Sequence, residues 1–257
     1  MRTTSVFTPR ARPVFALSLG VALLFTGCVS NRYRMAKKDT PPPNLLNVAF
    51  APTPLGAELT TLITYNGPGS WKREAFWDEY VVTLHNPGHQ LLTISAAALV
   101  DYTGSALQPG DNPWALEKES KTLERKYKDA GIAFVRYTAP GGLIVGAGVL
   151  AISSAGIFSA GAATAATATV VALPVYYLAV IIINHNNKAA VDKEFNRRRL
   201  VLPLTLASGE TLAGSFFFPM VPEPRRLDLV VQSEGTTTTS SLPLDFLQGL
   251  HVSRPKP

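Results

Sequence analysis

The chain has 257 residues, a formal net charge of +6 and a single cysteine. This length is enough for one medium domain or two small ones with a buried core. A single cysteine excludes an intramolecular disulfide, and the basic residues do not alternate with aromatic ones in the way that marks a nucleic-acid-binding surface.

The first 27 residues have the pattern of a secretory signal peptide. Arg2, Arg10 and Arg12 form a basic start, an apolar run covers residues 14–25, and small residues precede Cys28. This pattern predicts export and removal of residues 1–27, which we therefore leave out of the predicted fold.

The last letters of this segment, LFTGC, resemble the lipobox of bacterial lipoproteins, in which the chain is cut before a cysteine that carries the lipid; Phe25 stands where that pattern prefers leucine. The resemblance implies that Cys28 is acylated, and several acyl chains on one residue hold a protein firmly on a membrane. Val29 occupies the second mature position, where aspartate would imply retention in the inner membrane. The resemblance thus implies a periplasm-facing protein of the outer membrane, with residues 28–44 as a flexible tether.

Two blocks of the chain, 45–110 and 200–257, alternate apolar and polar residues as strands do. The NPGH sequence at 86–89 predicts a turn between two strands of the first block. Prolines at 203 and 243 predict edge strands in the second block. The predicted apolar faces consist of Tyr80, Val82 and Leu84; of Leu92, Ile94, Ala96, Ala98 and Val100; of Leu202, Leu204 and Leu206; of Leu227, Leu229 and Val231; and of Leu242, Leu244 and Phe246.

Each block contributes about four strands, which is too few for a stable domain of its own. We therefore expect one antiparallel β-sandwich built from both blocks and interrupted by the residues between them. The short strands loosely resemble the Ig-like domains of bacterial exported proteins, and this resemblance implies an Ig-like sandwich.

Residues 111–136 predict a charged helix. Asn112 is suited to the N-cap and Pro113 to the first helical position. The pairs Glu117/Lys121 and Glu124/Lys128 have four-residue spacing, and the apolar stripe is thin, so we expect an exposed helix. Residues 188–199 form the basic end of a further predicted helix.

Between Arg136 and Lys188 the chain carries no acidic or basic residue. Its halves, 141–160 and 165–184, each match a helix of roughly 20 residues, which is about 30 Å long and spans a bilayer core. We expect an apolar helical hairpin over 137–187. Small residues would allow its two helices to pack closely, and the packing positions are Gly142, Gly146, Gly156 and Gly161.

If both β-blocks lie in one sandwich, the apolar segment crosses a membrane an even number of times or not at all. Basic flanks normally stay in the cytoplasm, which conflicts with an exported chain. Three alternatives remain: the hairpin enters the outer membrane from the periplasm, it is buried in an oligomer, or it is a buried helical pair in a soluble protein.

The sequence contains no GxSxG, HExxH, Walker or dinucleotide-binding motif. His85 and His89 flank a turn without an acidic partner, so we expect no metal and no cofactor. The carboxylate pairs Asp78/Glu79 and Glu117/Glu119 are interpreted as solvated. The remaining candidates for a binding surface are aromatic, and we interpret most of them as core or membrane-interface residues: Trp71, Trp77, Trp114, Phe216, Phe217 and Phe218.

The sequence therefore predicts a lipid-anchored protein of the bacterial cell envelope with a structural, assembly or binding role and no catalytic activity. An oligomeric pore or export-complex subunit with packed hairpins is the alternative, and an enzyme is the third hypothesis. The expected partners are membrane lipid through Cys28, and membrane or helical partners through 139–187. We expect no nucleic-acid partner.

Overall fold

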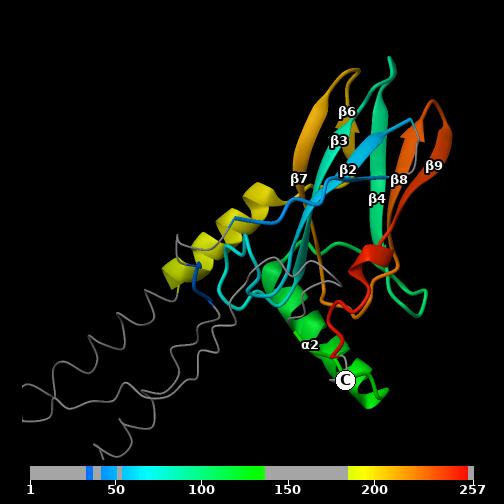
Figure 1. The fold of residues 1–257 in the computed structure, drawn as a ribbon. Coiled ribbons are helices and arrows are strands. Elements are labelled where there is room, and N and C mark those ends of the chain that lie inside the picture. Colours follow the sequence, from blue (N-terminus) through cyan, green and yellow to red (C-terminus); the bar gives the residue numbers. More distant parts are fainter. Residues whose placement is uncertain (1–32, 37–41, 51–53, 137–184, 254–257) are drawn as a thin grey trace, which may run out of the picture.

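The computed structural model describes residues 33–36, 42–50, 54–136 and 185–253. They form two antiparallel sheets that face each other (Figure 1). The first sheet has the order β1 (Val48–Ala49), β2 (Gly56–Ile63), β3 (Asp78–His85) and β7 (Thr211–Phe218). The second has the order β5 (Ala106–Leu107), β4 (Leu92–Val100), β8 (Arg226–Ser233) and β9 (Thr236–Pro243), and β6 (Leu204–Leu206) also pairs with β4.

Strands from the two sides of the apolar segment pair with each other in both sheets. In the first sheet β3 runs beside β7 from Asp78↔Phe218 to His85↔Thr211. In the second sheet β4 lies between β8 on one side and β5 and β6 on the other. The expected mainly-β class with two antiparallel sheets is confirmed.

The core between the sheets follows the predicted alternation in most strands. Tyr80, Val82 and Leu84 of β3 are fully buried, and the predicted face of β8 is buried as well. The prediction is wrong for Ala96 and Ala98 of β4, whereas Val100 is buried as predicted. The register shifts between Ile94 and Ala96, where an extra residue turns the strand over.

Because of this bulge, Ala97 and Leu99 of β4 are fully buried, whereas Ala96 and Ala98 are partly exposed. The proline predictions are confirmed. Pro243 ends β9, the last strand in the order of its sheet, and Pro203 directly precedes β6, which pairs with β4 at one side.

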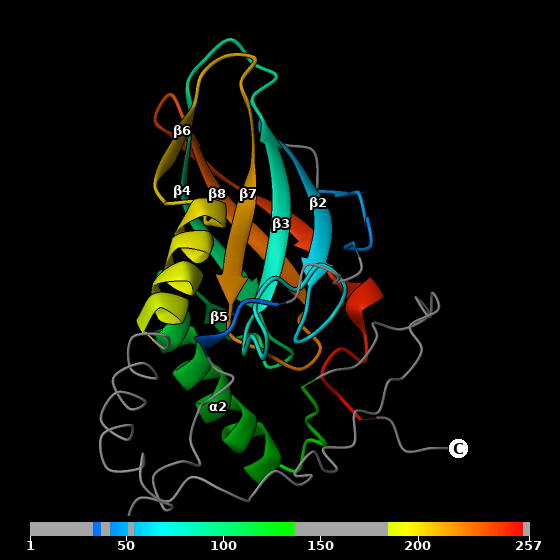
Figure 2. The same ribbon diagram turned by 90° about the vertical axis from the view of Figure 1, so that its left-hand side faces the viewer.

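Two helices pack beside β7 and at one end of the first sheet (Figure 2). These are α2 (Pro113–Asp129) and a helix over residues 185–198. Phe216 and Phe218 of β7 face the core between the sheets, and Phe217 faces the opposite way into a second cluster. The buried members of that cluster are Ala75, Trp77, Leu116, Val191, Phe195 and Phe217.

Helix α2 begins as predicted. The side chain of Asn112 accepts hydrogen bonds from the amides of Trp114 and Ala115, and Pro113 is the first helical residue. The expectation of an exposed helix is wrong, because α2 buries a stripe of mixed polarity: Leu116, Glu117, Ser120, Glu124 and Tyr127.

Within the described residues, no helix is both long and apolar enough to cross a membrane. The predicted hairpin over 137–187 lies outside the described residues, apart from its last three positions.

Candidate functional site: the platform at the ends of the apolar segment

The two ends of the apolar segment lie along the same helix. Arg136, the last described residue before the segment, donates from Nε to Glu124 Oε2 at 3.2 Å. On the far side of the segment, Asp192 accepts a 2.7 Å hydrogen bond from Trp114 Nε1. Trp114 and Glu124 are separated by a rise of about 15 Å along α2. Residues on both sides of the apolar segment are thus held by the same helix.

The tether also reaches this helix. The rings of Tyr33 and Trp114 meet edge to face with centroids 5.1 Å apart. Met35 forms an isolated β-bridge with Lys72, and the amide of Ala36 donates to the carbonyl of Trp71 at 2.8 Å. We call the structure that these segments form the platform; it consists of residues 33–36, 71–79, 111–136, 185–199 and 250–253.

Residues 133–136, which directly precede the apolar segment and which we call its departing end, pair with the C-terminal segment. Phe134 and Val252 form an antiparallel bridge. The amide of Val135 donates to the carbonyl of His251 at 2.9 Å, and the amide of Ser253 donates to the carbonyl of Ala133 at 2.8 Å. Residues 133–135 are therefore held to the sandwich before the chain leaves it.

A buried ion pair lies beneath this contact. The side chains of Asp78 and His251 are fully buried, with His251 Nε2 2.9 Å from Asp78 Oδ2. His251 Nδ1 lies 3.1 Å from the carbonyl oxygen of Val135. Both ring nitrogens face oxygen acceptors, and only the imidazolium donates from both.

The electrostatics agree with a charged His251. Burial by itself lowers the pKa of His251, but the negative charge of Asp78 and the hydrogen bonds to Asp78 and to the backbone of Val135 and Arg136 outweigh burial, so the pKa is raised above 6.5. The interpretation of Asp78 as solvated is wrong. No sequence pattern predicts this ion pair, because its two residues come from distant parts of the chain.

A second buried carboxylate holds the returning end. Glu79 is 1% exposed; it accepts from Trp71 Nε1 and Ser215 Oγ, each at 2.7 Å, and from Arg198 Nη1 at 3.3 Å. The amide of Leu200 donates to the carbonyl of Ser215 at 2.9 Å. The chain that returns from the helix over 185–198 is thereby fixed against β7, and the interpretation of Glu79 as solvated is also wrong.

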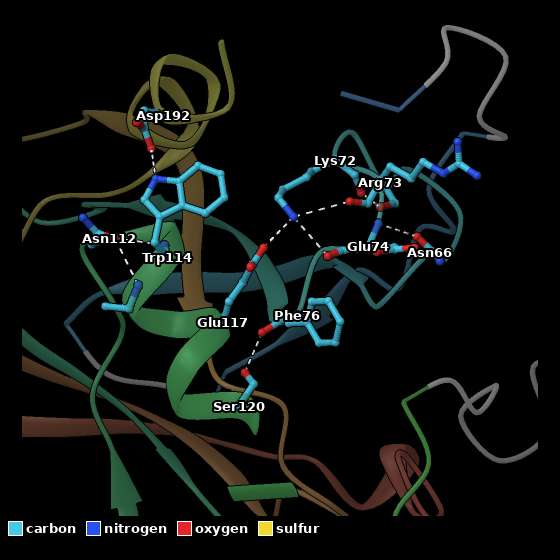
Figure 3. A network of polar contacts seen from close by, with 12 residues as sticks. Asn66, Lys72, Arg73, Glu74, Phe76, Asn112, Trp114, Glu117, Ser120 and Asp192 are labelled. Carbon is cyan, nitrogen blue, oxygen red and sulfur yellow. Dashed lines mark hydrogen bonds and ion pairs between the residues drawn. The ribbon is translucent and has the colours of Figure 1, made fainter. Parts of the chain in front are cut away.

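A third buried pair joins the loop at 71–77 to α2. Figure 3 shows Lys72 reaching from this loop toward Glu117. Lys72 Nζ lies 2.5 Å from Glu117 Oε1, both side chains are fully buried, and the ammonium also donates to the carbonyl of Glu74 at 3.0 Å. Glu117 thus pairs with Lys72 rather than with the expected Lys121. Glu124 pairs with Lys128 at 2.7 Å, as predicted.

Most of the aromatic candidates are core residues. Trp77 and Phe216–Phe218 are buried, and the partly buried Trp71 and Trp114 use their indole nitrogens to bind carboxylates of the platform. His85 forms a hydrogen bond with Thr211. The side chains of His89 and His185 are exposed. The described residues contain no cluster of potential metal ligands. Cys28 and the proposed packing residues Gly142, Gly146, Gly156 and Gly161 lie outside the described residues.

The contacts of the platform hold chain segments in fixed positions. Its buried acidic groups are bound to cations, indole nitrogens or hydroxyls of the platform or of β7. These contacts fix three segments at one end of the sandwich: the tether, the start of the apolar segment and its return.

Comparisons with known proteins return no match: no family model fits the chain, and no curated protein and no solved structure is similar to it.

Proposed function

We propose that the protein is a lipid-anchored component of the bacterial cell envelope in which an Ig-like sandwich serves as a rigid mount for an apolar helical hairpin. Cys28 carries the lipid, and the hairpin over 137–187 enters a membrane or packs against helices of a partner. The role is structural or in assembly.

One observation carries this proposal: the tether, the departing end and the returning end all contact α2. Tyr33 is five positions after Cys28, so the acylated residue lies within about 18 Å of the platform even in a fully extended chain. A hairpin that starts and ends on the platform therefore begins close to the membrane that receives the lipid.

Membrane fractionation of four chains tests the proposal. They are the wild type, Cys28→Ala with residues 1–27 replaced by a signal peptide that is cleaved without lipidation, a chain in which a Gly/Ser linker replaces 137–184, and the combination of both changes. A linker of about 30 residues has a root-mean-square length of about 30 Å, so Arg136 and His185 need not lie close together for the linker to join them.

We expect the wild type and each single variant in the membrane fraction and the combined variant in the soluble fraction. Release of Cys28→Ala alone would show that the hairpin does not hold the protein in a membrane. A soluble wild type would overturn the whole proposal. A discrete ring after mild detergent extraction would instead indicate a pore or export-complex subunit.

A further inference from the structure

Charge is distributed unevenly over the described residues. Almost all lysines and arginines lie on the platform, and the rest of the described sandwich carries only Arg225 and Arg226. Its acidic side chains outnumber these two cations and are Glu58, Asp101, Glu210, Glu223, Asp228, Glu234 and Asp245. The platform is therefore the basic part of the described molecule, and the described residues outside it are acidic on balance.

Several acidic groups of the platform are turned inward. Glu117 is fully buried against Lys72, and Glu79 is buried between Trp71, Ser215 and Arg198. Glu124 is mostly buried. Asp111, Glu119 and Asp129 remain exposed. Burial of part of the negative charge leaves cations in excess on the surface of the platform.

Four cations form a stripe along α2. Lys118, Lys121, Arg125 and Lys128 follow each other at spacings of three and four, which places them on one face of the helix. Lys121 Nζ lies 4.5 Å from the ring centroid of Phe76, and Arg136 Cζ lies 4.8 Å from the same centroid. The stripe therefore borders the point at which the chain leaves the platform.

The returning end has a cation in a similar place. Lys188 is exposed and its Nζ lies 5.6 Å from the ring centroid of Trp114, the residue that also contacts Tyr33 of the tether. Cations thus accompany each of the three segments that connect the platform with the lipid or the apolar segment.

We propose that the platform docks on anionic phospholipid headgroups through the stripe Lys118, Lys121, Arg125 and Lys128, with Lys188 beside it. This inference rests on the proposed function, because the lipid on Cys28 brings the platform within about 18 Å of a bilayer surface. Attraction to an anionic surface acts within about 8 Å at physiological ionic strength. The tether is short enough to allow this contact.

The test follows the distance between α2 and the membrane in the full, acylated chain. Thr122 is exposed on α2, and with Cys28 acylated a Thr122→Cys replacement provides the only free thiol for a fluorescent donor. The labelled chain is reconstituted into phosphatidylcholine vesicles with or without phosphatidylglycerol, and energy transfer to a headgroup-labelled lipid is measured. We expect stronger transfer with phosphatidylglycerol and a loss of this increase at high salt.

Two variants with the same change in net charge separate a local contact from a general charge effect. Lys118→Gln with Arg125→Gln removes two cations of the stripe, whereas Ser208→Glu with Gln232→Glu adds two negative charges at exposed positions outside the platform. Each basic residue near an anionic surface strengthens binding about fivefold. The stripe variant should weaken docking roughly 30-fold, and the control variant should retain it.

Equal energy transfer in neutral and anionic vesicles, or equal transfer in the stripe variant and the wild type, would overturn the docking surface. Flotation of the same samples reports on the proposed function separately. A chain that floats with the vesicles but shows no charge-dependent energy transfer agrees with the proposed function and contradicts only the docking surface. A chain that does not float contradicts the proposed function.

Discussion

Asp78 and His251 are 173 positions apart in the chain, yet their side chains meet in a fully buried ion pair with 2.9 Å between Oδ2 and Nε2. The same imidazolium binds the carbonyl of Val135, one residue before the last described residue of the departing end. One ionised group thus connects β3, the C-terminal segment and the start of the apolar segment.

This relationship predicts a loss of stability at alkaline pH. The pKa of His251 is raised in the folded protein, so its contribution is fully present below pH 6.5 and is lost as the pH rises through the raised pKa. Thermal unfolding of wild type and His251→Asn should differ most below pH 6.5, and the difference should shrink as the pH rises above this value. Asparagine suits the control because His251 has a φ of +57°, which asparagine tolerates. A constant difference at every pH would show that His251 is neutral in the fold.

Removal of one member of the Lys72–Glu117 pair should destabilise the protein strongly. Glu117→Gln leaves the buried ammonium of Lys72 without its counter-ion, and such a change costs about 3–5 kcal/mol. Urea denaturation measures this loss, and Lys72→Met with Glu117→Leu should recover much of it. Lys128→Ala is the matched surface control, because Lys128 is half exposed and its pair with Glu124 is worth about 1 kcal/mol or less. Similar losses for Glu117→Gln and Lys128→Ala would contradict the assignment.

Gly214 of β7 lies where the returning chain passes closest to the sheet. A Cβ at this position would lie 2.5 Å from Leu200 Cδ2 and 3.2 Å from the carbonyl oxygen of Arg198. Gly214→Ala should therefore destabilise the protein by about 1–3 kcal/mol, and Leu200→Ala should relieve part of that loss when it is combined with Gly214→Ala. Gly88→Ala meets only ordinary contact with Asn86 and serves as the control. An unchanged unfolding midpoint for Gly214→Ala would show that the returning chain is not held at this distance.

The helix over 185–198 should lose support in acid. Hydrogen bonds from Arg197, and less strongly from Arg198, outweigh burial and lower the pKa of Glu194 to about 2. Its contribution is therefore present above pH 4.5 and is lost as the pH falls toward 2. The protection of this helix against hydrogen exchange, relative to the intrinsic exchange rate at each pH, should fall over that range more in the wild type than in Glu194→Gln. In Glu194→Gln the helix is already weakened at neutral pH. The same acid response in both chains would contradict a role for Glu194.

The sequence predicted what local patterns determine. The alternation in β3 and β8, the cap at Asn112 and the edge prolines all appear where they were expected. Part of β4 was missed because a bulge inverts an alternation that otherwise looks regular.

The platform was missed for a different reason. A carboxylate at the start of a strand or on a charged helix looks solvated when its partner is far away in the chain. Lys72 meets Glu117 across 45 positions, and Asp78 meets His251 across 173. Only the tertiary structure brings these groups together, and no spacing rule connects them.

The pairing of β3 with β7 also imposes an order in time. His85 and Thr211 are neighbours in the sheet but 126 positions apart in the chain. During synthesis, β3 and β4 emerge well before β7 and β8, and contacts of such long range form slowly. Until the last 60 or so residues arrive, the edges of β3 and β4 that β7 and β8 later cover therefore remain without these partners. Exposed strand edges of this kind favour aggregation.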